Sequence, residues 1–242
     1  MQLAKSYAIS LMGLAGTLIE IEAEISSNLP SFVLVGLPDA SLSESKDRVR
    51  AAIHNSGLKM PARRVTVNLS PASVRKQGSS FDLAIAVAIL AANNVIPQKP
   101  TSSIIHIGEL GLDGSIRRVA GVLPSLIAAV SAGVTRAIVP MANLAEARLA
   151  QGIEVVGAVH LAQVAQMHGA DTNFEFEEYL DSGNSVSPQA DSQFNAVDIS
   201  DVLGQEDAIE ALTFAAAGGH HLLMVGPPGA GKTMIAKRLP TI

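Results

Sequence analysis

The residues with the clearest chemical pattern form one glycine-rich segment near the end of the 242-residue chain. They match G-x-x-x-x-G-K-[ST] at every fixed position and are Gly226, Pro227, Pro228, Gly229, Ala230, Gly231, Lys232 and Thr233. In such a loop, glycine lets several backbone N–H groups converge on phosphate oxygens without an intruding side chain. Lys232 would neutralise the β- and γ-phosphates, and the Thr233 hydroxyl would ligate Mg²⁺. The pattern predicts a binding site for ATP with Mg²⁺.

The flanks of this loop support the same interpretation. The apolar run 221–225 predicts a strand before the loop, and residues 234–239 predict the start of a helix after it. A helix that begins directly after the loop would direct the positive end of its dipole at the phosphates. The alternative is a Gly/Pro turn that fits the spacing by chance, and the strand–loop–helix context argues against it.

Charge is distributed unevenly along the chain, which has 17 Lys and Arg, 22 Asp and Glu, and a net charge of −5. Residues 1–148 hold 14 of the basic residues and 10 of the acidic ones, whereas residues 149–231 contain no Lys or Arg. Residues 169–197 combine acidic residues with Ser, Gly, Asn and Pro, which predicts an acidic, solvated linker. We therefore expect a domain at 1–168, this linker, and a second module at 198–242.

Composition excludes several classes of protein. The 48% hydrophobic content is enough for a buried core and excludes wholesale disorder. The absence of Cys excludes disulfides, thiol catalysis and iron–sulfur clusters, and it fits a cytoplasmic chain. The longest apolar run, 83–92, is half of what spans a bilayer, so we expect no membrane segment.

The first domain shows both hairpin and crossover signals, which predicts an α+β fold. Residues 81–92 are apolar on nearly every side and predict a buried helix. Ser41 with Glu44 three residues later predicts a capping box at the start of an earlier helix. Asp113 and Gly114 predict the turn of a hairpin.

Residues 198–205 read Asp-Ile-Ser-Asp-Val-Leu-Gly-Gln, and residues 237–240 read Lys-Arg-Leu-Pro. Together with the glycine-rich loop, these segments resemble the opening of an AAA+ module of the Mg chelatase-like ATPase family. The run Ala-Ala-Gly-Gly-His-His-Leu-Leu at 216–223 resembles more narrowly the competence (ComM, YifB) type of that family. The resemblance implies that 198–242 begins an α/β P-loop NTPase module. It also implies a hexameric, ATP-hydrolysing ring that processes DNA by branch migration in natural competence and recombination.

The same resemblance extends to residues 1–168, through Gly-Leu-Pro-Asp at 36–39, Asn-Leu-Ser-Pro-Ala at 68–72 and Gly-Glu-Leu-Gly-Leu-Asp-Gly at 108–114. It implies a Lon-protease-like domain, related to domain 2 of ribosomal protein S5. Ser80 occupies the position of the nucleophile in the Lon proteases, but Leu123 occupies the position of the Lys that acts as base. A serine hydroxyl without a base is a poor nucleophile. We therefore expect no labelling of Ser80 by a serine-directed probe.

Several basic residues could contact nucleic acid phosphates: Arg63, Arg64, Arg75 and Lys76. Aromatic residues make up 3% of the chain and there is no Trp, so platforms for base stacking are sparse. The residues alone leave an ordinary protein surface and a DNA-binding surface equally open, and the resemblance favours DNA binding.

Two alternatives to a DNA-processing motor stay open. One is a chelatase motor subunit that drives Mg²⁺ into a porphyrin, and the other is a non-enzymatic module for docking or ring assembly. The sequence given stops nine residues after Thr233, so it holds no Walker B strand, sensor residue or arginine finger. We therefore expect this chain alone to bind ATP without hydrolysing it.

Overall fold

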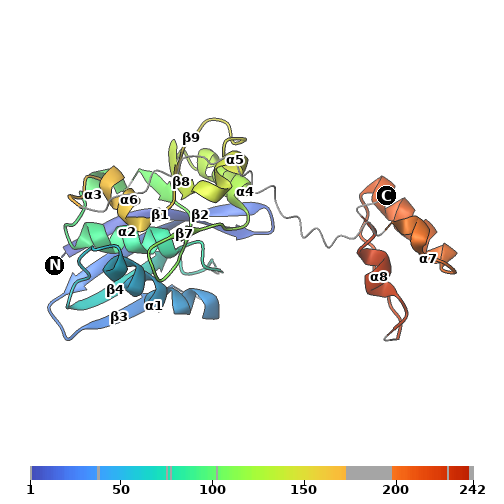
Figure 1. Cartoon of the computed structure of the whole chain (residues 1–242), viewed down its shortest axis with the longest axis horizontal. Coiled ribbons are helices and arrows are strands. Elements are labelled where there is room, and N and C mark those ends of the chain that lie inside the picture. The colour runs from blue at the N-terminus through green and yellow to red at the C-terminus, as the bar shows by residue number, and fades with distance from the viewer. Residues whose placement is uncertain are drawn as a thin grey trace. The chain divides into compact units, whose positions relative to one another are not determined.

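The structure is a computed structural model that describes residues 2–36, 39–74, 76, 78–101, 103–172, 198–227 and 229–239. Internal contacts divide the chain into two compact units, residues 1–177 and 178–242, and each unit is described by itself (Figure 1). Residues 173–197, which form most of the expected acidic linker, lie outside the described residues.

A seven-stranded sheet forms the centre of the first unit, in the order β3-β4-β2-β1-β5-β8-β9. Its strands are β1 (Gln2–Met12), β2 (Ala15–Ser26), β3 (Ser31–Val35), β4 (Arg64–Ser70), β5 (Ile104–His106), β8 (Arg136–Pro140) and β9 (Glu154–Ala158). Strand β2 pairs antiparallel with both β1 and β4, and the remaining neighbours pair in parallel. A separate ribbon joins β6 (Glu109–Leu110) to β7 (Ile116–Arg117). The fold is therefore mixed α/β, with hairpins and crossovers in one sheet.

Helices pack on both faces of this sheet. They are α1 (Ala40–Asn55), α2 (Asp82–Ala92), α3 (Gln98–Thr101), α4 (Val122–Ser131), α5 (Leu144–Ala147) and α6 (Leu161–Met167), with a 3₁₀ turn η1 (Met141–Asn143). Successive side chains of a strand point to opposite faces, so Ala8 of β1 lies in the core around α2 and Ile9 lies in the core around α4.

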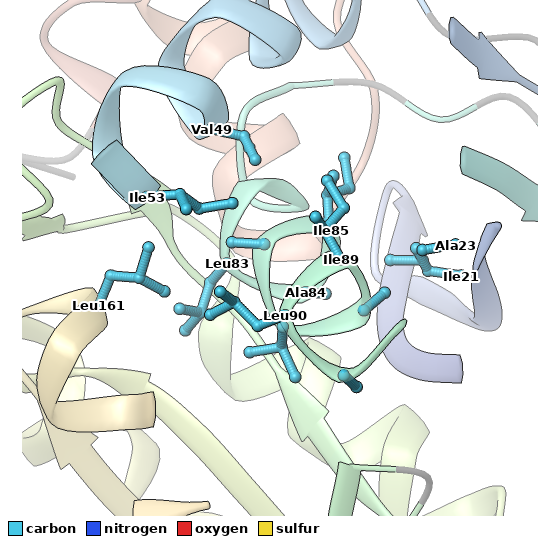
Figure 2. Packing of buried hydrophobic residues seen from close by; sticks show 14 of the residues in the cluster. Ile21, Ala23, Val49, Ile53, Leu83, Ala84, Ile85, Ile89, Leu90 and Leu161 are labelled. Carbon is cyan, nitrogen blue, oxygen red and sulfur yellow. The ribbon is translucent and has the colours of Figure 1, made fainter. Parts of the chain in front are cut away.

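Helix α2 is the centre of the larger core. Every residue of α2 is buried, as the apolar run at 81–92 predicts. Figure 2 shows its side chains between Val49 and Ile53 of α1, Ile21 and Ala23 of β2, and Leu161 of α6. Because apolar neighbours surround α2, no face of this helix needs to be polar, which explains its lack of amphipathic periodicity.

The start of α1 differs from the prediction. The helix begins at Ala40, and the carboxylate of Asp39 caps it by accepting a 2.7 Å hydrogen bond from the N–H of Leu42. Ser41 was predicted to be the cap, but it lies inside the helix. Asp39 has extended backbone geometry, from which its side chain reaches the free N–H groups of the first turn.

The only charged residue of α2, Asp82, takes part in a buried ion pair. Its carboxylate accepts hydrogen bonds from Nε and Nη2 of Arg48 at 2.7 and 3.1 Å, and from the N–H of Leu110 at 3.2 Å. The Asp82 side chain is fully buried. Burial raises the pKa of Asp82, and the Arg48 guanidinium opposes that rise. The buried Asp82 carboxylate of α2 is therefore bonded both to α1, through Arg48, and to β6, through Leu110.

Replacing Arg48 with methionine should strongly destabilise the first unit, because it leaves the Asp82 carboxylate buried without a cation. We expect Arg48→Met to lower the free energy of unfolding by about 3–5 kcal/mol, measured by urea denaturation. Arg50→Met, at an exposed position of the same helix, should stay within about 0.5 kcal/mol of the wild type. A loss for Arg48→Met no larger than that of the control would contradict the assigned role of the pair.

Two buried histidines face each other where β5 meets the end of α6. Nε2 of His106 and Nε2 of His168 are 2.9 Å apart. Burial lowers the pKa of both imidazoles, to about 4 for His168, where the positive charge of Arg136 adds to the effect. His106 Nδ1 is buried and has no hydrogen-bond partner among the described residues. Both rings are therefore neutral in the folded state near neutral pH.

This histidine pair should make stability depend on pH. Because both pKa values are lower in the folded chain, the unfolded chain binds more protons below the ordinary value of 6.5. The neutral histidine pair therefore leaves the free energy of unfolding undiminished above pH 6.5. That free energy decreases as the pH falls from there towards about 4. Urea denaturation at about pH 7 and pH 5 should show this loss for the wild type and a smaller one for the double variant H106Q/H168Q. Equal losses in the two proteins would contradict it.

The second unit contains α7 (Glu206–Gly218), α8 (Lys232–Ala236) and a 3₁₀ turn η2 (Ile199–Asp201) around a small core. The strand predicted at 221–225 is not formed within the described residues, and this prediction is wrong for the chain as it stands. A strand needs a neighbour for its backbone N–H and C=O groups, and no described segment pairs with this one. Leu223 and Val225 are 86% and 87% exposed, so no other element covers the segment.

No helix in the described part of the chain combines the length and the apolar character needed to cross a bilayer. The longest described helix, α1, has 16 residues and carries several charged side chains. Helix α2 is apolar but has only 11 residues, and all of them are buried inside the protein. The apolar residues of α1 and α2 are therefore explained by packing within the first unit.

Candidate functional site

The glycine-rich loop has the backbone that its sequence requires. Gly229 has φ +83° and Gly231 has φ +76°, in the left-handed region that side chains other than glycine rarely adopt. Gly231 is also the residue from which α8 begins. Pro228 lies outside the described residues. The two glycines therefore let the chain turn sharply between the segment at 221–225 and α8.

Lys232 bends back over this loop. Its Nζ atom donates hydrogen bonds to the carbonyl oxygens of Gly226 at 2.8 Å and Pro227 at 2.7 Å. The ammonium group thus lies beside the backbone that the loop would wrap around a phosphate. A bound phosphate would offer Lys232 charged oxygen acceptors in place of these two carbonyls, and charge-assisted hydrogen bonds are the stronger ones.

Thr233 follows Lys232 in the first turn of α8, and its side chain is exposed. The first N–H groups of a helix have no partner inside the helix, so Lys232 and Thr233 both present free backbone donors. A hydroxyl at this position can ligate Mg²⁺ that is shared with a phosphate. The geometry thus brings together the cation, the hydroxyl and the backbone donors that the sequence pattern predicts.

The segment before α7 is connected to the far end of α8. The Asp198 carboxylate accepts a hydrogen bond of 2.9 Å from the N–H of Ser200, and this contact lowers the pKa of Asp198. Asp201 accepts in return from the N–H of Asp198, which completes a capping box on η2. Nε of Arg238 donates to the Asp198 carbonyl at 2.9 Å. Residues 198–201 therefore pack beside the elements that carry the loop.

Ser80, the residue at the nucleophile position, lines a hollow in the first unit. The hollow has a volume of about 450 Å³ and is lined by Ile9, Leu11, Gly78, Ser79, Ser80, Ile107, Glu109, Arg118, Val119, Ala120 and Ser125. Ser79 donates a hydrogen bond to the Glu109 carboxylate. No lysine or histidine is among the lining residues, and the guanidinium of Arg118 does not deprotonate. Among the described residues, the hollow therefore offers Ser80 no amine or imidazole base.

Leu123, which stands where a catalytic lysine would, lies in the first turn of α4. Its N–H donates to the Glu146 carboxylate at 3.2 Å. Leu123 is not among the residues that line the Ser80 hollow.

The four basic residues proposed for DNA contact fall into different environments. Arg63 directly precedes β4 and Arg64 begins it, and both residues are exposed. Lys76 is fully buried, and its Nζ atom donates to the carbonyls of Gly36, at 3.0 Å, and Pro71. The expectation that Lys76 contacts a phosphate is therefore wrong for this conformation, since two loop carbonyls and burial hold its ammonium inside. Arg75 lies outside the described residues.

The role of Lys76 could not be found from its sequence neighbours. Burial lowers the pKa of its ammonium group, which is the opposite of what a surface lysine beside phosphates would show. Its own carbonyl accepts from the N–H of Asp39, and the Asp39 carboxylate accepts from the N–H of Gly78. Lys76 thus connects the loop before α2 to the start of α1.

Comparison with known proteins adds an independent line of evidence. The family model described as subunit ChlI of Mg-chelatase matches residues 21–143, and the model described as magnesium chelatase, subunit ChlI, matches residues 198–242. An uncharacterized protein of Mycobacterium tuberculosis is 43% identical over 240 residues, and competence protein ComM of Haemophilus influenzae is 39% identical over 242. DNA repair protein RadA of Streptococcus pyogenes is 36% identical over 95 residues, which cover 39% of this chain and 20% of RadA.

The alignments with the Mycobacterium protein and with ComM each cover 99% of this chain but 46% of the relative. The chain therefore spans about half the length of these relatives. The match at 21–143 alone covers about half of the chain, and the second match includes the glycine-rich loop. On these grounds the chain belongs to the Mg chelatase-like family of AAA+ proteins, and within it to the ComM type.

Proposed function

We propose that this chain binds ATP with Mg²⁺ at residues 226–233, as the nucleotide-binding part of a motor that hydrolyses ATP in the full-length protein. The observation that carries the proposal is the loop itself, in which Gly229 and Gly231 have positive φ and Lys232 lies over the backbone. A polyphosphate accepts hydrogen bonds from the N–H groups and also neutralises the charge of the ammonium group, whereas a neutral ligand only accepts hydrogen bonds. Hydrolysis would further require an acidic metal-holding residue and an arginine from a neighbouring subunit.

The full-length protein, on this proposal, forms a hexameric ring and acts on DNA. Support comes from relatives whose names refer to competence and to DNA repair, one of which aligns with nearly the whole chain. A chelatase subunit is the second candidate, because both matching family models carry that description. Capture of branched DNA, but not of chelatase partner subunits, by the full-length protein would favour the DNA-processing role.

For the first unit we propose a Lon-protease-like fold, similar to domain 2 of ribosomal protein S5, that has no peptidase activity. The supporting observation is the Ser80 hollow, whose described lining includes serines, Glu109 and Arg118 but no amine base. A serine needs such a base to attack a peptide carbonyl. The unit would then serve binding or assembly.

Removing the ammonium group of Lys232 should abolish tight nucleotide binding. We expect Lys232→Ala to weaken the binding of MgADP to the 242-residue chain by more than about tenfold, measured by isothermal titration calorimetry. Lys237→Ala, which removes an exposed lysine from the same unit, should bind like the wild type. Thr233→Ala should lose the enhancement of ADP binding by Mg²⁺ and keep metal-free binding. Equal affinity of Lys232→Ala and wild type would contradict the proposed site.

Arg63 and Arg64 are the described, exposed residues from which a DNA contact is still proposed. The double variant R63Q/R64Q should bind double-stranded DNA more weakly. It should also reduce the slope of log K against log salt by about two, one for each phosphate contact. Fluorescence polarisation with a labelled duplex over a salt series measures both quantities. Arg148→Gln, at another exposed position, is the matched control. An unchanged slope for R63Q/R64Q would exclude these arginines from the DNA contact.

A further inference from the structure

Gln205 touches the glycine-rich loop from outside the loop sequence. It directly precedes α7, and its Nε2 atom donates a hydrogen bond to the carbonyl oxygen of Ala230 at 3.3 Å. A Cβ atom added to Gly231 would lie 2.8 Å from the same Nε2 atom. The Gln205 amide therefore packs directly against the peptide that joins Ala230 to Gly231, and a side chain at position 231 would displace it.

The surrounding elements keep Gln205 in this place. Its carbonyl accepts the hydrogen bond of 3.0 Å from the N–H of Ile209 that opens α7. Val202, Leu212 and Ile235 form the buried core that joins the segment before α7, α7 itself and α8. The backbone of Gln205 and the loop carbonyl are thus attached to elements that share one core.

Holding a carbonyl determines where the neighbouring N–H points. In a trans peptide the C=O and the following N–H lie in one plane and point in opposite directions. When Gln205 holds the Ala230 carbonyl, the N–H of Gly231 is directed away from Gln205. No backbone carbonyl among the described residues accepts that N–H. It is one of the donors that the loop has available for a ligand.

Gln205 also differs from the other group that engages loop carbonyls. Lys232 holds the carbonyls of Gly226 and Pro227 through its charge, and it must release them to meet a phosphate. The Gln205 amide is neutral and engages a different carbonyl, so a bound anion attracts it less strongly than it attracts the Lys232 ammonium. It can hold the 230–231 peptide in the same orientation before and after binding.

We propose that Gln205 is a positioning residue for the phosphate loop, which fixes the 230–231 peptide so that the Gly231 N–H donates to a nucleotide phosphate. This inference rests on the proposed function, because it assigns a role within that nucleotide site. Gln205 contacts the loop and not the nucleotide, so its effect is confined to how well the phosphates are held.

The test compares Gln205→Leu, which keeps the size of the side chain but removes the donor, with Asp207→Asn, an exposed neighbour at the start of α7. Isothermal titration of the 242-residue chain with MgADP should show binding about tenfold weaker for Gln205→Leu and unchanged for Asp207→Asn. The ³¹P resonance of the β-phosphate of bound ADP should shift from its wild-type position in Gln205→Leu. The melting temperature without nucleotide should match the wild type, because the predicted loss is specific to the phosphates.

The outcomes separate the inference from the function on which it rests. Failure of the wild-type chain to bind MgADP would overturn the proposed function. Wild-type binding together with equal affinity and an equal ³¹P shift for Gln205→Leu would overturn only the role of Gln205. A weaker affinity that comes with a lower nucleotide-free melting temperature and an unchanged ³¹P shift would also overturn it, as a structural effect. Gln205→Glu, which presents an oxygen to the Ala230 carbonyl, should reproduce the loss if Gln205→Leu folds poorly.

Discussion

A phosphate can be held by a protein backbone only where several N–H groups converge on one point, and this constraint governs the second unit. Convergence requires a turn that side chains would obstruct, which is why Gly229 and Gly231 have positive φ. It also requires that the peptides keep their orientation when a ligand binds. Gln205 engages the Ala230 carbonyl, whereas Lys232 engages the carbonyls of Gly226 and Pro227 and would release them to a phosphate. Because α7 and α8 share one small core, Gln205 and Lys232 both stay close to the loop.

The first unit depends on a different constraint, the burial of a helix that is apolar on every side. Helix α2 needs cover from all directions, and α1, α6 and the sheet provide it. Asp82, the first residue of α2, forms a buried ion pair with Arg48 of α1. The loop just before α2 carries Ser80, which lines the hollow. The buried ion pair that stabilises the unit and the serine that lines the hollow therefore belong to one short chain segment, residues 80–82.

Local sequence patterns predicted those features that depend only on residues close together in the chain. The buried helix at 81–92 and the glycine turn at 226–233 each follow from residues close together in the chain. The predicted strand at 221–225 failed because pairing needs a partner outside the segment. The burial of Lys76, the pairing of Asp82 with Arg48 and the contact of His106 with His168 depend on residues 5 to 62 positions apart. No local pattern marks such contacts.

The proposed nucleotide site requires that backbone N–H groups of the glycine-rich loop donate to nucleotide phosphates. Amide hydrogen exchange of the 242-residue chain, followed by NMR with and without MgADP, tests it most directly. The N–H groups of Gly229, Gly231, Lys232 and Thr233 should exchange markedly more slowly when MgADP is bound, whereas amides of the first unit should not change. Unchanged exchange at these four positions under saturating MgADP would contradict the account.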